Sequence, residues 1–290
     1  MKAFQTRFIL DGIFIRDNQL WLIDNEILLK QNEREFSAFV LTQGEIYSED
    51  DAKKKIIPFL TSSSIFIHKQ SNLQVSGHNE INSINDLGKN LTVTTSYHIG
   101  TRTGLNKDMV LNIKCLCEKI IELNEKFFFL ENASIFFYES TRYIIDKYKL
   151  QKVQKEQFIN AFVVLESLFN ESINDIIYKI SIRISSLLKA FDHQATKTFD
   201  NMIDLYKIRN DIVHGSGKKI LSFDDMETLQ DYAEKCLISM YILCLNRRNK
   251  SKTDFKIALM REIDETLLND EKQYQIINEI RDGLKNFNIS

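Results

Sequence analysis

The feature that most constrains this fold is a long stretch, from Leu105 to His214, that contains neither glycine nor proline. These two residues are the strongest helix breakers, and a long gap between them is typical of successive long helices. The gap is rich in Leu, Ile, Lys, Glu and Asn. By contrast, six of the nine glycines and the single proline, Pro58, lie within the first 104 residues. The chain therefore divides into two parts of different character.

The first part is expected to be rich in β-strands. Segments with β-branched and aromatic residues in partial alternation indicate strands. They occupy residues 6–15, 19–23, 35–41 and 91–97, with a shorter pair at 65–68 and 73–75. One helix is expected over residues 48–60, because Ser48 can cap it and three acidic residues follow in the first turn. We therefore predict a β-rich domain over residues 1–104.

The second part is expected to be a helical bundle, because apolar residues recur there at steps of three and four. The predicted helices span 109–129, 132–148, 155–170, 175–191, 198–214 and 222–247, with one or two more between 253 and 287. Gly283 is expected to weaken the last of these. The predicted fold class is α+β, with a β-rich N-terminal domain (1–104) followed by an all-α domain (105–290).

Composition limits the classes of partner. The 290 residues carry 38 basic and 40 acidic side chains, a formal net charge of −2. Neither part has an excess of bases, which argues against a protein that holds long duplexes by neutralising phosphates. No apolar run approaches the roughly 20 residues that cross a bilayer. The chain also begins without the apolar segment of a signal peptide, so we expect no membrane association and a cytoplasmic location.

The cysteines give no sign of a metal site. Only Cys115 and Cys117 are close together, and no histidine lies near them at the spacing of a zinc site. Buried free thiols are the expected state of all four cysteines, as is usual in a reducing compartment. We therefore expect neither a metal nor another cofactor.

The sequence RNDIVHG at 209–215 carries the strongest chemical signal. Arg209 offers a permanent cationic fork for phosphate, and His214 can accept or donate a proton near neutral pH. On a helical wheel these two and Asn210 lie opposite an apolar stripe. Such a set can cleave a phosphodiester without a metal. The simpler interpretation is a solvated helix face, with His214 stabilising the helix C-terminus and Gly215 ending it.

Three blocks of sequence occur in a fixed order around this motif. They read AFVVLESLF at 161–169, YKISIRISSLL at 178–188 and LYKIRNDIVHG at 205–215, preceded by the aromatic run IFFY at 135–138. This order resembles the Apea-like branch of the HEPN superfamily, whose ribonuclease motif is an arginine and a histidine separated by four to six residues. The resemblance covers roughly residues 130–250.

The resemblance implies a helical bundle that forms a homodimer, with two copies of the motif facing each other across the interface. Many such proteins are metal-independent endoribonucleases of antiviral, abortive-infection or toxin systems. Arg209 and His214 match the two named motif residues, and Asn210 matches the polar residue that follows the arginine. RNA is then the substrate, the product ends are 2′,3′-cyclic phosphates, and a regulatory partner or phage trigger remains open.

Two other interpretations stay open beside the ribonuclease. Some members of the superfamily keep the fold without activity, so the chain could be a non-catalytic module for dimerisation or for nucleotide or partner binding. A metal-dependent hydrolase is disfavoured, because no cluster of His, Asp and Glu supports one.

Glu166 and Arg183 stand in the other two matching blocks. The simplest expectation is that they form a partly buried ion pair between successive helices and fix the register of the bundle. The alternative is that they line the cleft.

Overall fold

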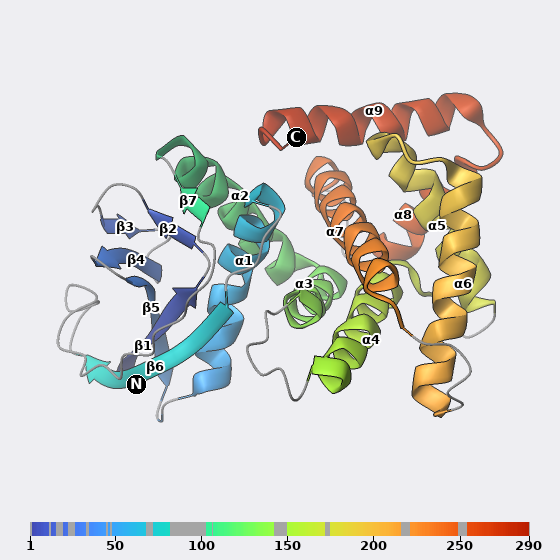
Figure 1. The fold of residues 1–290 in the computed structure, drawn as a ribbon. Helices are drawn as coiled ribbons and strands as arrows, with labels where there is room; N and C mark the ends of the chain where they lie inside the picture. Colours follow the sequence, from blue (N-terminus) through green and yellow to red (C-terminus); the bar gives the residue numbers. More distant parts are fainter. Residues whose placement is uncertain are drawn as a thin grey trace. The chain divides into compact units, whose positions relative to one another are not determined.

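The computed structural model is mostly helical, with an antiparallel sheet near the N-terminus (Figure 1). It describes residues 2–11, 13–15, 20–22, 27–32, 35–44, 46, 48–67, 72–81, 103–105, 107–141, 150–171, 175–215, 221–248 and 254–289. The described residues form two compact units. One contains those up to Ile121, and the other contains Glu122–Thr141 with those from residue 150 onward.

Within the described residues of the first unit, five strands form one antiparallel sheet in the order β3-β4-β5-β1-β6. Their bounds are β1 Lys2–Asp11, β3 Leu20–Leu22, β4 Ile27–Asn32, β5 Glu35–Gly44 and β6 Asn72–Ile81. A separate parallel pair joins β2 (Ile13–Ile15) to β7 (Thr103–Leu105). The sheet confirms the β-rich character of this part. The strand predicted at 91–97 lies outside the described residues.

The interior strand β1 pairs with β5 on one side and with the edge strand β6 on the other. Arg7 in β1 lies opposite Phe39 in β5, and its guanidinium carbon is 5.8 Å from the centre of the Phe39 ring. The register between β1 and β6 shifts after Arg7, where Ser76 is the extra residue. Such a bulge increases the local twist of the pair.

The helix α1 (Glu49–Ile67) begins where the sequence predicts, and Ser48 Oγ accepts the Asp51 N–H at 3.2 Å. It continues past Pro58 to Ile67, so the predicted end at residue 60 is wrong. Residues 65–67 of the strand predicted at 65–68 are helical, and His68 lies outside the described residues. The buried hydroxyls of Ser62 and Ser63 donate to carbonyls one turn earlier, each at 2.9 Å. These local bonds satisfy polar groups that would otherwise cost free energy on burial.

The second unit is a bundle of helices, as predicted from the spacing of apolar residues. Its elements are the last turn of α2 (Lys107–Lys126), α3 (Phe128–Thr141), α4 (Leu150–Phe169), α5 (Ile176–Leu187), the short 3₁₀-helix Leu188–Phe191, α6 (Ala195–His214), α7 (Phe223–Asn246), α8 (Phe255–Glu265) and α9 (Asp270–Asn286). The boundary predicted at residue 104 lies before α2, whereas the two compact units divide within α2.

The core of the bundle is built around α7, which packs against α3, α4, α5, α6 and α9. Every residue from Cys236 to Cys244 is buried, so this helix is enclosed on all sides. Its start matches the prediction, because Ser222 and Asp225 form a capping box. Both cysteines here and Cys117 are buried thiols without a disulfide, whereas Cys115 is exposed, contrary to the expectation of four buried thiols.

Gly283 lies in the middle of α9 and allows this helix to approach α7 closely. A Cβ atom added at Gly283 would lie 2.9 Å from Ile242 Cγ1, which is closer than carbon atoms pack. The residue therefore has a packing role, and α9 continues through it to Asn286.

None of the helices in the described ranges combines the length and the apolar character needed to cross a bilayer.

Candidate functional site

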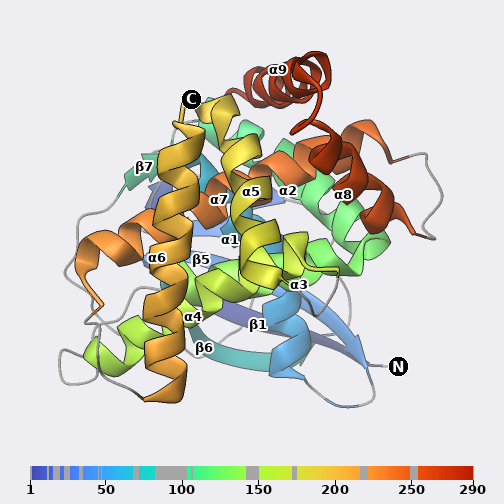
Figure 2. The same cartoon turned by 90° about the vertical axis from the view of Figure 1, so that its right-hand side faces the viewer.

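The helix α6 ends with the motif at 209–215. The face of α6 opposite to Arg209 and His214 is buried. Thr198, Met202, Leu205 and Ile208 are the buried residues of α6. Gly215 adopts a left-handed conformation (φ 66°) and its N–H donates to the carbonyl of Asp211, which ends the helix directly after His214. The motif is therefore held by a rigid helix. Figure 2 shows α5 and α6 side by side.

Arg209 is half-buried and lies against two side chains. Its Nη2 is 3.4 Å from Glu166 Oε1 in α4, and its guanidinium carbon is 5.5 Å from the centre of the Tyr206 ring. Its Nε is fully enclosed and has no hydrogen-bond partner among the described residues. Within the described parts of the chain, the guanidinium thus has an ion pair and a ring contact but donates no hydrogen bond.

Arg183 in α5 uses its donors fully. Its Nε and Nη2 donate to the two carboxylate oxygens of Asp264 at 2.7 and 2.6 Å, and its Nη1 donates to the carbonyl of Phe169 at 2.5 Å. Only 4% of its side chain is exposed. This is the bidentate geometry of a structural arginine.

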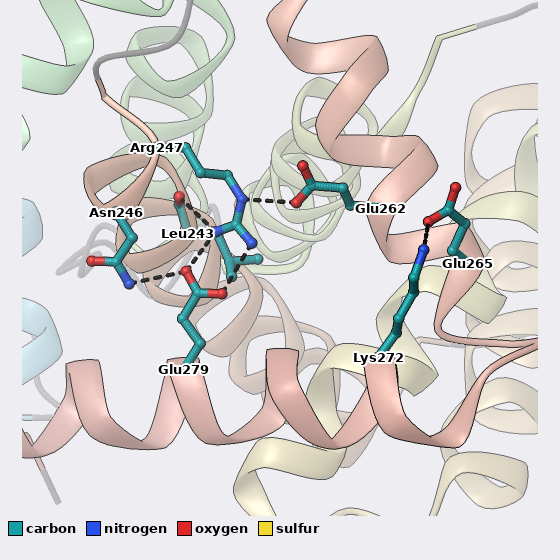
Figure 3. A network of polar contacts seen from close by, with 7 residues as sticks. All are labelled: Leu243, Asn246, Arg247, Glu262, Glu265, Lys272 and Glu279. Carbon is teal, nitrogen blue, oxygen red and sulfur yellow. Dashed lines mark hydrogen bonds and ion pairs between the residues drawn. The ribbon is translucent and has the colours of Figure 1, made fainter.

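Arg247, at the end of α7, likewise uses its donors in hydrogen bonds within the bundle (Figure 3). Its guanidinium donates to Glu262 at 2.8 Å, to the two oxygens of Glu279 at 2.5 and 3.0 Å, and to the carbonyl of Leu243 at 3.1 Å. These bonds tie α7 to α8 and α9. Among these three half-buried or buried arginines of the bundle, Arg209 is the one whose guanidinium makes no hydrogen bond to the described residues.

The pKa of Glu166 is shifted by its surroundings. Burial raises the pKa of its carboxyl above the ordinary value, and the nearby Arg209 cation opposes this shift in part. The ion pair is therefore loose, partly enclosed and without hydrogen bonds. An anion that offered Arg209 better geometry would compete well with Glu166.

Asn210 and His214 extend the polar face of α6 toward its end. Asn210 is half-buried, and His214 is exposed in the last turn. His214 follows Arg209 by five positions, so they lie about 7.5 Å apart along the axis and about 140° apart around it. Val213, which is 49% exposed, lies between them. One α6 therefore carries the two groups on different parts of its surface, with the exposed Val213 between them.

The predicted ion pair between Glu166 and Arg183 is wrong. Glu166 pairs with Arg209, and Arg183 pairs with Asp264 and, at 3.5 Å, with Glu171. The structure thus places Glu166 beside Arg209 of the motif, and Arg183 beside Asp264 and Glu171.

Sequence reasoning missed three residues that shape the surroundings of the motif. Tyr206 could have been found, because it lies one turn before Arg209 on the same helix. Asp264 and Lys256 could not, because no local pattern connects α8 with α4 and α5.

Groups of three or more His, Cys, Asp or Glu side chains that could hold a metal are absent from the described residues. Comparison with known proteins finds no match to a family model, to a curated protein or to a solved structure.

Proposed function

We propose that this protein is a metal-independent endoribonuclease of the HEPN type, acting in the cytoplasm in antiviral defence or as a toxin. The observation that carries the proposal is Arg209, which is half-buried beside Glu166, makes no hydrogen bond to the described residues and precedes an exposed histidine by five positions. A cation that can hold a phosphate and an imidazole that can move a proton are the two groups that metal-independent phosphodiester cleavage uses.

In the proposed reaction, His214 accepts the proton of the ribose 2′-hydroxyl, and the 2′-oxygen attacks the adjacent phosphorus. The bond to the 5′-oxygen breaks, and a second histidine protonates that oxygen. Arg209 stabilises the extra negative charge on the phosphorane-like transition state. Asn210 orients the phosphate. The product has a 2′,3′-cyclic phosphate end, and DNA is not cut because it lacks the attacking hydroxyl.

A homodimer would supply the second His214. Half-buried or exposed residues of α6 recur at alternating steps of four and three, the spacing of a helix-pairing seam. They are Phe199, Ile203, Tyr206, Asn210 and Val213. This seam adjoins Arg209 and His214, so a second copy of α6 packed on it would bring the two motifs together.

A non-catalytic module for dimerisation or for nucleotide or partner binding is the second candidate. The uncovered Val213 favours an interface on this face of α6 whether or not cleavage occurs. The two candidates differ in one respect: only the ribonuclease needs the His214 imidazole.

The test is incubation of the purified protein with total cellular RNA in the presence of a chelator, followed by end-group analysis. The wild type is compared with His214→Ala and Arg209→Ala, and with His193→Gln and Arg261→Ala as matched controls elsewhere in the bundle. We expect cyclic phosphate ends from the wild type and both controls only. Cleavage that survives His214→Ala, or that the chelator abolishes, would reject the proposal.

A further inference from the structure

The last turn of α4 is held by cations from two other helices. Lys256 Nζ in α8 donates to the carbonyls of Ser167 and Asn170 at 2.7 and 2.8 Å. Arg183 Nη1 in α5 donates to the carbonyl of Phe169 at 2.5 Å. The last four carbonyls of a helix have no partner within it, and cations are favourable there. These two side chains therefore complete the end of α4.

Lys256 and Arg183 are themselves held in place by other residues. Arg183 is clamped by both carboxylate oxygens of Asp264, which belongs to α8 as Lys256 does. The Lys256 ammonium lies 5.5 Å from the centre of the Phe129 ring in α3. The position of α8 thus determines where both donors meet α4.

Glu166 lies in this same turn. The N–H of Asn170 donates to the carbonyl of Glu166 at 2.9 Å, while the carbonyl of Asn170 accepts from Lys256. The Glu166 carboxylate then contacts Arg209 in α6. A continuous series of contacts therefore leads from Lys256 through Asn170 and Glu166 to the proposed phosphate-binding guanidinium.

We propose that Lys256 and Arg183 are positioning residues, which orient Arg209 by holding the turn of α4 that carries Glu166, so that α8 controls the site. The inference rests on the proposed function for its catalytic consequence. Its structural part, the coupling of Lys256 to Arg209, can be measured without RNA.

The structure offers a matched control for a loss of packing alone. Arg247 is similarly bound to α8, through Glu262, but its hydrogen bonds and ion pairs within the described residues reach only α7, α8 and α9. Arg247→Lys should therefore weaken the bundle without moving Glu166. The test variants are Lys256→Met, which removes the donors at nearly constant volume, and Arg183→Lys, which keeps the charge but loses the fork. Lys256→Arg is the conservative rescue.

The first measurement is kcat and KM for a short RNA, with the urea midpoint of each variant to correct for folding. Lys256→Met and Arg183→Lys are expected to lower kcat about 3- to 10-fold, a typical size for coupling through a packed network. KM should change less, and Lys256→Arg should restore kcat. Arg247→Lys should lower the urea midpoint but leave kcat unchanged. An unchanged kcat in Lys256→Met, or an equal loss in Arg247→Lys, would overturn the inference.

The second measurement separates this inference from the proposed function. The urea midpoints of Lys256→Met, Arg209→Gln and the double variant are compared in the absence of RNA. If the residues are coupled, the double variant shifts the midpoint by clearly less than the two single shifts added together. Additive shifts would overturn the coupling. Non-additive shifts in a protein that cuts no RNA would leave the coupling intact and reject the ribonuclease alone.

Discussion

Glu166 and Arg209 form an ion pair between α4 and α6 that is close in space but poor in geometry. Their nearest charged atoms are 3.4 Å apart, and about a quarter of each side chain is exposed. Arg183 and Asp264, by contrast, meet through two hydrogen bonds of 2.6 and 2.7 Å. A pair that retains exposure and lacks hydrogen bonds contributes little to stability, because desolvation offsets much of its attraction. The proposed function uses this weakness, because a phosphate with better geometry would displace Glu166 from the arginine.

Replacing Arg209 by lysine tests whether the fork or only the charge matters. Lysine keeps the cation but cannot offer paired donors to a phosphate or stack on Tyr206 in the same way. We expect kcat for RNA to fall about 100- to 1,000-fold, as when a donor to the transition state is lost. The urea midpoint should hardly move, because lysine keeps the charge that pairs with Glu166. A variant that retains full activity would show that Arg209 acts as a point charge only.

The pH dependence of stability should reveal the buried carboxyl of Glu166. Because burial raises its pKa above 4.5, the folded protein binds this proton more tightly than the unfolded chain does. Its contribution is therefore greatest below pH 4.5 and declines as pH rises through the folded-state pKa. Glu166→Gln should remove this part of the decline in a urea-midpoint series, and Glu234→Gln on α7 serves as the control. An identical pH profile in Glu166→Gln would contradict the assignment.

The contribution of His193 to stability should change with pH in the opposite direction to that of Glu166. Its Nε2 is 2.9 Å from Lys235 Nζ and 3.6 Å from Asp231, both in α7, and Asp192 and Lys197 are also charged neighbours. Burial, with help from the Lys235 cation, lowers the pKa of His193 below 6.5. The unfolded chain therefore takes up this proton first as pH falls, and stability declines below about pH 6.5.

The substitution His193→Gln should flatten this decline, because glutamine can accept from Lys235 without titrating. The measurement is the urea midpoint between pH 7.5 and 5, beside direct titration of the His193 ring by NMR. A His193 ring that titrates above 6.5 would contradict the prediction.

The sequence predicts helix positions well where the signal is local. Ser222 begins α7 and Gly215 ends α6 as expected, because caps depend on neighbouring residues. Residues 65–67 were predicted as a strand from their β-branched and aromatic character, but they continue α1, in which Ile65 is buried. Propensity is a weak guide where tertiary packing decides.

The partners of charged residues were harder to predict than the helices. Glu166 and Arg183 lie on successive helices, so proximity along the chain favoured pairing them. The structure pairs each with a residue far along the sequence, Arg209 and Asp264. No spacing rule connects such residues, because their contact depends on how α4, α5, α6 and α8 pack. The motif could be recognised from the sequence, but its surroundings could not.

Gly283→Ala tests the close contact of α9 with α7. Alanine favours a helix over glycine by about 1 kcal/mol, so a solvent-facing glycine would gain stability from the change. Here the new methyl would overlap Ile242, and overpacking of a core typically costs about 1–3 kcal/mol. We therefore expect a net fall in the free energy of unfolding, measured by urea denaturation.

Ile242→Ala supplies the compensating change, because it removes the Cγ1, Cγ2 and Cδ1 atoms that the new methyl would meet. The double variant Gly283→Ala, Ile242→Ala should lose clearly less stability than the two single losses added together. Ile238→Ala, at a buried residue one turn earlier in α7, is the matched control and should add its full cost to that of Gly283→Ala. Stabilisation by Gly283→Ala alone would instead mean that α9 and α7 are less tightly packed than the structure indicates.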